Sequence, residues 1–178
     1  MNGKSRLILA ASVLALVGAG QLALSAQEKY AAQLPGGIPF SDFKGYEDWR
    51  LISASKTDDR IKVILGNPTI IAAFKAGAPG NGKPFPQGSK IAKIQWKPKK
   101  STEAPFQVDV PDTLADLFFM EKDAKRFAQT GGWGYAQFDF DPSSMSFTAD
   151  PAGTPACGNA CHTAVKSKDY VFHPYQMR

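Results

Sequence analysis

The feature that most constrains this chain is a short segment near its C-terminus in which two cysteines and a histidine lie together. Its sequence is Cys157-Gly158-Asn159-Ala160-Cys161-His162. Two thiols followed directly by an imidazole are typical of covalent haem attachment, in which the sulfurs bond to the haem vinyl groups and the histidine binds the iron. The usual motif has two residues between the cysteines, and this one has three. The segment therefore predicts thioether bonds from Cys157 and Cys161, with His162 as the proximal ligand of the iron.

Two other interpretations of these residues stay open. In an oxidising compartment, Cys157 and Cys161 can form a disulfide that closes a small loop. The same two cysteines, together with His162 and His173, also have the ligand types of a zinc site, although structural zinc sites rarely use adjacent ligands. The upstream segment 151–155 contains two prolines and a glycine, and we expect a loop there that absorbs the extra residue of the motif.

The N-terminus has the pattern of a secretory signal peptide. Lys4 and Arg6 precede an apolar run over residues 7–17, and small residues follow up to Ala26. We expect cleavage after Ser25 or Ala26, which makes residues 1–26 a signal peptide and residues 27–178 one haem domain. Export to the periplasm agrees with the cysteine motif, because haem is attached to such proteins outside the cytoplasm.

The size and charge of the mature chain exclude some classes of function. Its 152 residues are enough for one domain with a single core. Loss of Lys4 and Arg6 leaves 19 basic and 16 acidic side chains, a formal charge of +3. A charge this small does not indicate nucleic-acid binding. A weakly basic surface suits an acidic electron-transfer partner in the periplasm. We expect the basic cluster at residues 97–100 to be a solvated loop.

The apolar pattern predicts an antiparallel sheet with short helices, an α+β fold in which the haem loop lies at the C-terminal end. We expect strands at residues 60–65, 89–96, 114–120 and 133–140. Asn67 and Pro68 indicate the start of a helix that ends before Gly77, and a second helix is expected at residues 123–130. The irregular leader over residues 27–45 ends by packing Phe40 and Phe43.

Several separated stretches form one larger pattern. They are Tyr46-Glu47-Asp48-Trp49, Ile64-Leu65-Gly66-Asn67, Phe85-Pro86-Gln87-Gly88-Ser89, Lys122-Asp123-Ala124-Lys125-Arg126-Phe127, Gly131-Gly132-Trp133-Gly134 and Lys168-Asp169-Tyr170-Val171-Phe172. Their order and spacing resemble the cytochrome P-460 family over nearly the whole mature chain. The resemblance, which extends to the related c-prime-beta cytochromes, implies an antiparallel sheet packed with helices, one five-coordinate c-type haem and a homodimer.

The resemblance also points to a lysine. Members of the family have a third covalent bond, from a lysine side chain to a meso carbon of the porphyrin, and the lysine follows a Gly-Thr pair on a strand. Gly88-Ser89 precedes Lys93 here at the matching spacing, so Lys93 is the candidate for this bond and Lys90 is the substitute. The alternation of the strand puts Lys93 on the face opposite Ala92 and Ile94, where a basic residue is more often simply solvated.

The distal side of the expected haem distinguishes two functions. In hydroxylamine-oxidising members, a carboxylate that accepts protons from the substrate lies on the strand before the Lys-Asp-x-Lys-Arg-Phe segment. The corresponding residue here is Phe118, which caps an iron site but carries no proton, and which equally suits a buried strand. Asp116 lies two residues earlier on the same face and is the alternative acid–base group.

Three functions follow as hypotheses. The first is a redox enzyme that oxidises a small nitrogen compound such as hydroxylamine or nitric oxide. The second is a binding protein that captures nitric oxide or carbon monoxide on five-coordinate iron beneath Phe118. The third is a simple periplasmic electron carrier with a sixth iron ligand, for which the candidates are Met120, Met145, Met177 and His173.

Overall fold

The computed structural model of the chain describes residues 30–34, 37–176 and 178. The expected signal peptide at residues 1–26 and Met177 lie outside these residues. Within the described ranges, no helix combines the length and the apolar character needed to cross a bilayer.

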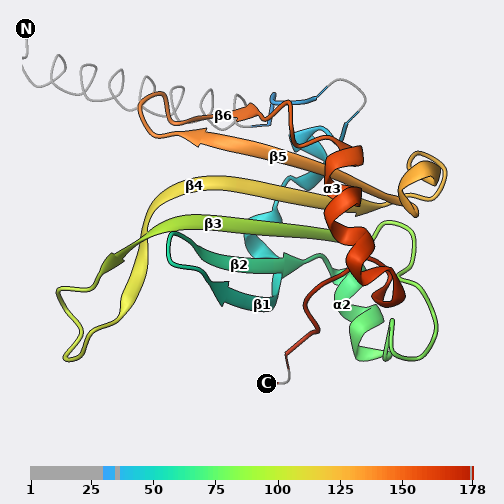
Figure 1. Ribbon diagram of the computed structural model, residues 1–178, viewed down its shortest axis with the longest axis horizontal. Coiled ribbons are helices and arrows are strands. Elements are labelled where there is room, and N and C mark those ends of the chain that lie inside the picture. The colour runs from blue at the N-terminus through green and yellow to red at the C-terminus, as the bar shows by residue number, and fades with distance from the viewer. Residues whose placement is uncertain (1–29, 35–36, 177) are drawn as a thin grey trace, which may run out of the picture.

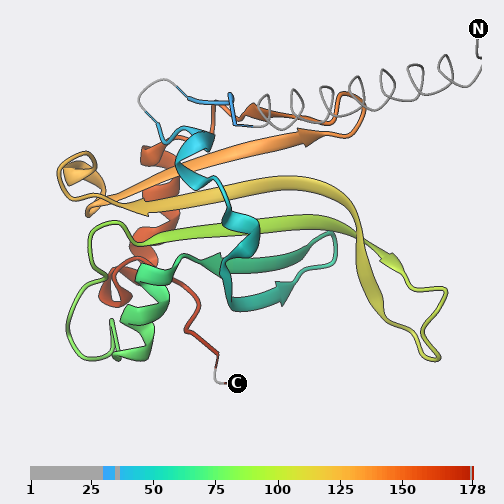
Figure 2. The ribbon, with the colours of Figure 1, turned by 180° about the vertical axis from the view of Figure 1, so that it is seen from behind.

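In the described part of the chain, six strands form one antiparallel sheet in which strands adjacent in sequence are adjacent in space (Figure 1). They are β1 (Arg50–Lys56), β2 (Ile61–Gly66), β3 (Lys90–Lys100), β4 (Asp109–Lys122), β5 (Trp133–Asp141) and β6 (Ser146–Ala149). The predicted α+β class and antiparallel sheet are confirmed. The long β3–β4 hairpin extends past its neighbours, and Figure 2 shows it reaching away from the rest of the sheet.

Aromatic residues fill one face of the sheet beneath two short 3₁₀ helices, η1 (Phe40–Phe43) and η2 (Tyr46–Asp48). Phe40 and Phe43 are fully buried, as predicted. Phe43 stacks on Phe119 of β4 with 4.0 Å between ring centroids. This face is therefore closed by the core, which leaves the other face to form a site.

The opposite face is covered by α2 (Pro68–Lys75), α3 (Pro155–His162) and the C-terminal segment, as Figure 1 shows. The start of α2 agrees with the prediction, because Pro68 is its first residue and the Asn67 side chain accepts a hydrogen bond from the Ile70 amide at 3.1 Å. The Asn67 amide group also donates to the Gly88 carbonyl at 2.8 Å. These bonds fasten the start of α2 to the start of β3.

The structures expected after β4 and at the end of β3 are wrong. Residues 123–130 form turns and a 3₁₀ helix, η3 (Ala128–Thr130), because the Asp123 side chain accepts bonds from the amides of Lys125 and Arg126 and closes a tight connection between β4 and β5. The basic cluster at residues 97–100 belongs to β3 and is no loop, since Lys100 pairs with Asp109 on β4 at 2.8 Å.

Candidate haem site

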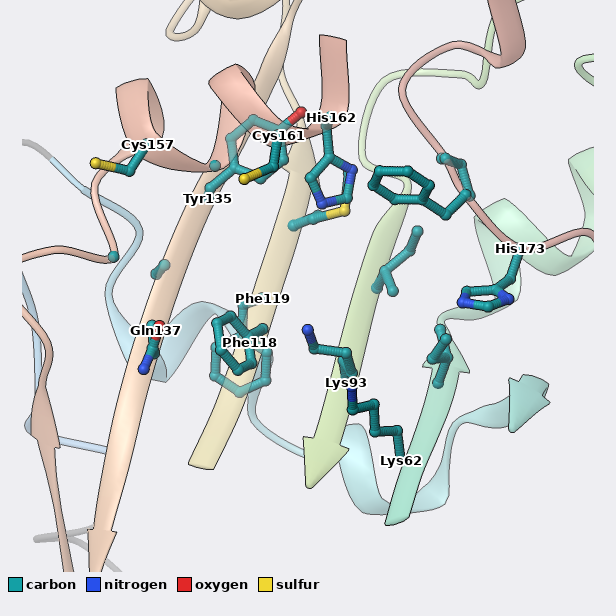
Figure 3. Close-up of a pocket in the computed structure, with 18 of the residues that line it drawn as sticks. Lys62, Lys93, Phe118, Phe119, Tyr135, Gln137, Cys157, Cys161, His162 and His173 are labelled. Atoms are coloured by element: carbon teal, nitrogen blue, oxygen red, sulfur yellow. The ribbon is translucent and has the colours of Figure 1, made fainter. Parts of the chain in front are cut away.

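The cysteine motif lies on a helix, α3, where a loop was expected. The Thr154 hydroxyl accepts a bond from the Cys157 amide at 3.3 Å and Pro155 occupies the first turn, so the start of the helix is well defined. Side chains four residues apart lie on the same face of an α-helix. The three-residue spacing therefore presents Cys157 and Cys161 on one side of α3, where both line the cavity while remaining exposed to solvent (Figure 3).

Helix α3 approaches β5 very closely between the two cysteines. A Cβ atom built on Gly158 would lie 2.3 Å from the ring of Tyr135, so only glycine allows this contact. Gly153, just before the helix, lies equally close to Gln137, where a Cβ would come within 2.5 Å of the side chain. These two glycines fix the height of the thiols above the strand.

A backbone carbonyl orients His162. Its Nδ1 lies 2.6 Å from the carbonyl oxygen of Tyr170, and because a carbonyl only accepts, Nδ1 carries the proton and donates. The lone pair therefore belongs to Nε2, the nitrogen that a metal would use. Burial lowers the pKa of His162, and the nearby positive charge of Lys93 lowers it further, against the opposing effect of the Tyr170 bond. Burial and charge thus favour the neutral imidazole.

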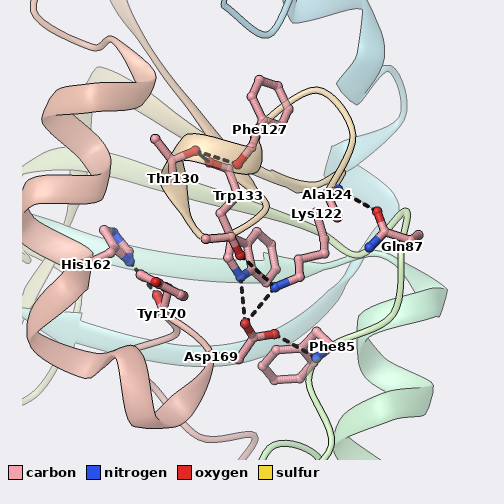
Figure 4. Close-up of polar contacts among 11 residues, drawn as sticks. Phe85, Gln87, Lys122, Ala124, Phe127, Thr130, Trp133, His162, Asp169 and Tyr170 are labelled. Atoms are coloured by element: carbon pink, nitrogen blue, oxygen red, sulfur yellow. Dashed lines mark hydrogen bonds and ion pairs between the residues drawn. The ribbon is translucent and has the colours of Figure 1, made fainter.

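The Tyr170 carbonyl is itself held in place by its neighbour, Asp169 (Figure 4). The Asp169 carboxylate accepts bonds from Lys122 Nζ at 2.6 Å, from the Phe85 amide at 2.7 Å and from Trp133 Nε1 at 3.3 Å. Lys122 and Asp169 are both nearly buried, so their ion pair is shielded from solvent.

Four of the stretches that suggested the family meet at this carboxylate. They supply the Phe85 amide, the Lys122 ammonium, the Trp133 indole and Asp169 itself. A Cβ on Gly131 would lie 2.3 Å from the Tyr170 ring, so this glycine, two residues before Trp133, makes room for the tyrosine side chain. These four stretches of the sequence pattern therefore supply the contacts that hold Asp169, the neighbour of the residue to which His162 bonds.

A cavity of about 430 Å³ lies between α3 and the sheet, within the usual range for ligand sites. A row of directly opposed residues forms its floor: Ile64 on β2, Lys93 on β3, Phe118 on β4 and Gln137 on β5. Cys157, Cys161 and His162 line it from α3 (Figure 3). The structure thus brings Lys93, Phe118 and the cysteine motif to one cavity.

Lys93 lies over an aromatic ring on this floor. Its Nζ is 3.7 Å from the centroid of the Phe118 ring, a cation–π contact. Burial lowers the pKa of Lys93, and the positive charge of Lys62 lowers it further. The substitute, Lys90, pairs with Glu121 at 3.3 Å and donates to the Asp42 carbonyl, and it is not among the cavity residues.

Asp116 does not line the cavity. Its carboxylate accepts a hydrogen bond from Gln95 and lies 3.8 Å from Arg60 Nε, two residues before Phe118 on β4.

Of the candidate sixth ligands, Met120 and His173 line the cavity, whereas Met145 is 71% exposed. Tyr135 and Lys62 also line the cavity. The sequence alone identified neither, because the residues that lie opposite each other on neighbouring strands are known only once the strand register is known.

The described residues form neither the disulfide nor the zinc site that the cysteines could also have made. Both thiols are free, and within the described ranges no group of three or more histidine, cysteine or acidic side chains converges as a metal cluster. The site has instead two thiols on one helix face, an imidazole with a free Nε2 and a cavity whose lining is mostly apolar. The buried Tyr135 hydroxyl beside it has no hydrogen-bond partner among the residues that the structure describes. These features fit a haem.

Comparison with known proteins agrees with this geometry. No curated protein matches the chain. The family model for Cytochrome P460 matches residues 43–173, which include the whole sheet, the Asp169 contacts and α3. The chain therefore belongs to the Cytochrome P460 family of haem proteins.

Proposed function

We propose that this chain is an exported c-type monohaem protein that keeps one iron position open for redox chemistry on small nitrogen compounds such as hydroxylamine or nitric oxide. The observation that carries the proposal is the bond from His162 Nδ1 to the Tyr170 carbonyl, which leaves Nε2 free at a cavity floored by Phe118. A phenyl ring offers no ligand atom, so this part of the floor leaves an iron site open.

Each residue has a separate role in this proposal. Cys157 and Cys161 form the thioether bonds, and His162 binds the iron through Nε2. The Tyr170 carbonyl fixes the imidazole ring and increases the basicity of the nitrogen that binds metal. The apolar ring of Phe118 on the cavity floor would exclude water from the open iron position. When bound, the haem supplies one-electron chemistry and the site for the small ligand.

Lys93 is proposed to bond to the edge of the porphyrin. Its pKa is lowered by burial, so more of the amine is in the neutral, nucleophilic form than on an exposed lysine. Forming the bond replaces one N–H and one C–H bond by a C–N bond and releases two protons and two electrons. A peroxide, reduced to water, would accept them.

The test uses holoprotein made in a periplasm that contains the cytochrome-maturation system. Ultraviolet–visible spectra of the reduced protein are compared between the natural chain and Lys93→Arg. We expect a strongly red-shifted Soret band that returns to an ordinary c-type position in the variant. An ordinary high-spin spectrum in both proteins would refute the Lys93 bond and leave the rest of the site in place.

A second candidate function is gas capture without catalysis. The position of Asp116 favours it, because that carboxylate bonds to Gln95 and does not reach the cavity, so it is poorly placed to accept protons from a substrate. Anaerobic mixing with hydroxylamine and a soluble electron acceptor separates the two. Sustained reduction of the acceptor supports the enzyme, whereas tight binding of nitric oxide without turnover supports the gas-binding protein.

The proposal includes the cellular context. We propose a periplasmic location, a homodimer and an acidic electron-transfer partner, each resting on the sequence pattern and the family. Sedimentation analysis of the holoprotein tests the dimer, and a monomer at micromolar concentration would contradict it.

A further inference from the structure

The cavity has two chemically different ends. At one end, α3 lies over β5 and supplies Cys157, and Gly153 just before the helix packs against Gln137. At the other end are Lys62 on β2 and His173 of the C-terminal segment (Figure 3). β5 and β2 are three strand spacings apart in the sheet, roughly 14 Å at the usual spacing between strands.

The end far from Cys157 is cationic. Lys62, Lys93 and His173 all line it, and the Ser55 hydroxyl lies on β1 beside them. Burial lowers the pKa of His173, and the positive charges of Lys93 and Lys62 lower it further. None of the ion pairs found among the described residues involves Lys62 or Lys93.

Unpaired cations gathered in a half-buried cavity favour an anionic group. In the proposed function, Lys93 gives up its proton to form a C–N bond, so Lys62 and His173 remain as the polar groups at this end. Lys62 is half-buried on the strand face that forms the cavity floor, and Lys62 Nζ donates in whichever direction an acceptor lies.

The chemistry of the haem supplies such an anion in a fixed place. Its two vinyl groups lie at one edge of the ring and its two carboxylates at the opposite edge. If Cys157 and Cys161 held the vinyl edge, the carboxylate edge would have to be held by residues at the end of the cavity far from Cys157, where Lys62 and His173 line it.

We propose that Lys62 and His173 bind the carboxylates at the haem edge opposite the thioether bonds. Lys62 forms the ion pair and His173 donates a hydrogen bond from its ring. The inference rests on the proposed haem function and adds the residues that hold the second edge of the cofactor. It also explains why His173 lines the cavity without being needed as an iron ligand.

The test compares purified holoproteins of Lys62→Gln and Lys62→Arg, with Lys97→Gln as control. Lys97 is an exposed lysine of β3 that does not line the cavity, so its change removes the same charge elsewhere. Two quantities are measured: the midpoint potential of the iron and the resonance Raman band of the propionate bending mode, which responds to hydrogen bonding.

We expect Lys62→Gln to shift the midpoint potential to lower values, because loss of a nearby positive charge favours the oxidised iron, and to shift the propionate band. Lys62→Arg should keep both close to those of the natural protein, and Lys97→Gln should leave the propionate band unchanged. His173→Gln should shift the same band without changing the spin state, which provides a second test if Lys62→Gln fails to mature.

Unchanged propionate bands in Lys62→Gln and His173→Gln holoproteins would overturn the inference while leaving the haem site intact. Failure of the natural chain to acquire haem would instead refute the proposed function. The two failures are therefore distinguishable.

Discussion

Tyr170 is the single residue on which the orientation of His162 depends most directly. Tyr170 and its predecessor Asp169 both have positive φ angles, 66° and 47°, a conformation that is uncommon for residues other than glycine. The three bonds to the Asp169 carboxylate and the space left by Gly131 hold this conformation in place. The backbone strain thus has a local function, which is to turn one carbonyl toward an imidazole.

Gly158→Ala tests the contact between α3 and β5. The added Cβ would lie 2.3 Å from the Tyr135 ring, so the helix must move away from the strand. We expect a loss of about 1–3 kcal/mol in the free energy of unfolding of the holoprotein, the usual cost of overpacking, together with a lower haem content. Thermal unfolding measures the first quantity, and Ala160→Ser, an exposed change between the same cysteines, is the control. A Gly158→Ala protein as stable as the control would contradict the packing described.

His173→Ala tests whether that imidazole binds iron. Although His173 lines the cavity, its place at the end far from Cys157 suits a carboxylate partner better than an iron ligand. We expect the visible spectrum and the spin state of the iron to be unchanged. A switch from low-spin to high-spin iron in the variant would show that His173 is the sixth ligand and would favour the electron carrier.

At the scale of secondary-structure elements, the sequence predicts the helices and strands that a short residue pattern marks. Asn67 and Pro68 mark the start of α2 correctly, and alternation reveals the inner strands β3 and β5. The edge strands β1 and β6 were missed, since they have fewer large apolar residues. Helix α3 (Pro155–His162) was also missed, because glycine, asparagine and cysteine are weak helix formers, and its start signals, Thr154 and Pro155, lie in a stretch whose proline and glycine content favours a loop.

In the candidate site too, the sequence predicts the residues that local patterns mark and misses those that depend on distant contacts. The cysteine motif and Lys93 were identified from the sequence, because short spacings and family-like segments carry them. Other features depend on contacts between residues 8 to 84 positions apart in the chain, namely the role of the Tyr170 carbonyl and the partners of Asp169. The position of Lys62 depends on the strand register. Local patterns do not contain this information.

Asp169→Asn tests the network that joins β4, β5 and the C-terminal segment. The change leaves the Lys122 ammonium, whose side chain is 7% exposed, without its carboxylate. Removing one partner of a buried ion pair typically costs about 3–5 kcal/mol, and we expect a loss in this range by urea unfolding. Asp112→Asn, which breaks the exposed pair with Lys99, is the matched control and should change the urea midpoint little. Equal effects of the two changes would rule out a special role for Asp169.

At the scale of the whole molecule, the sheet divides the protein into two functional halves. Aromatic packing beneath η1 and η2 closes one face, which leaves the other face for α3 and the cavity. The family match over residues 43–173 includes both halves. Stability and cofactor binding therefore use opposite faces of the same strands, and β4 contributes Phe119 to the first and Phe118 to the second.

The proposed export concerns the whole chain and has its own test. We expect protein purified from a periplasm to begin after Ser25 or Ala26, because that is where the small residues follow the apolar run. N-terminal sequencing decides the point. Retention of residues 1–25 on the purified protein would contradict signal-peptide cleavage.

The central claim is that Cys157, Cys161 and His162 form a covalent haem site. The most direct test is the intact mass, under denaturing conditions, of the mature protein made with the cytochrome-maturation system. The account predicts a mass equal to the polypeptide plus one haem. A polypeptide without haem that is lighter by two hydrogen atoms would show a disulfide between Cys157 and Cys161 and would contradict the account.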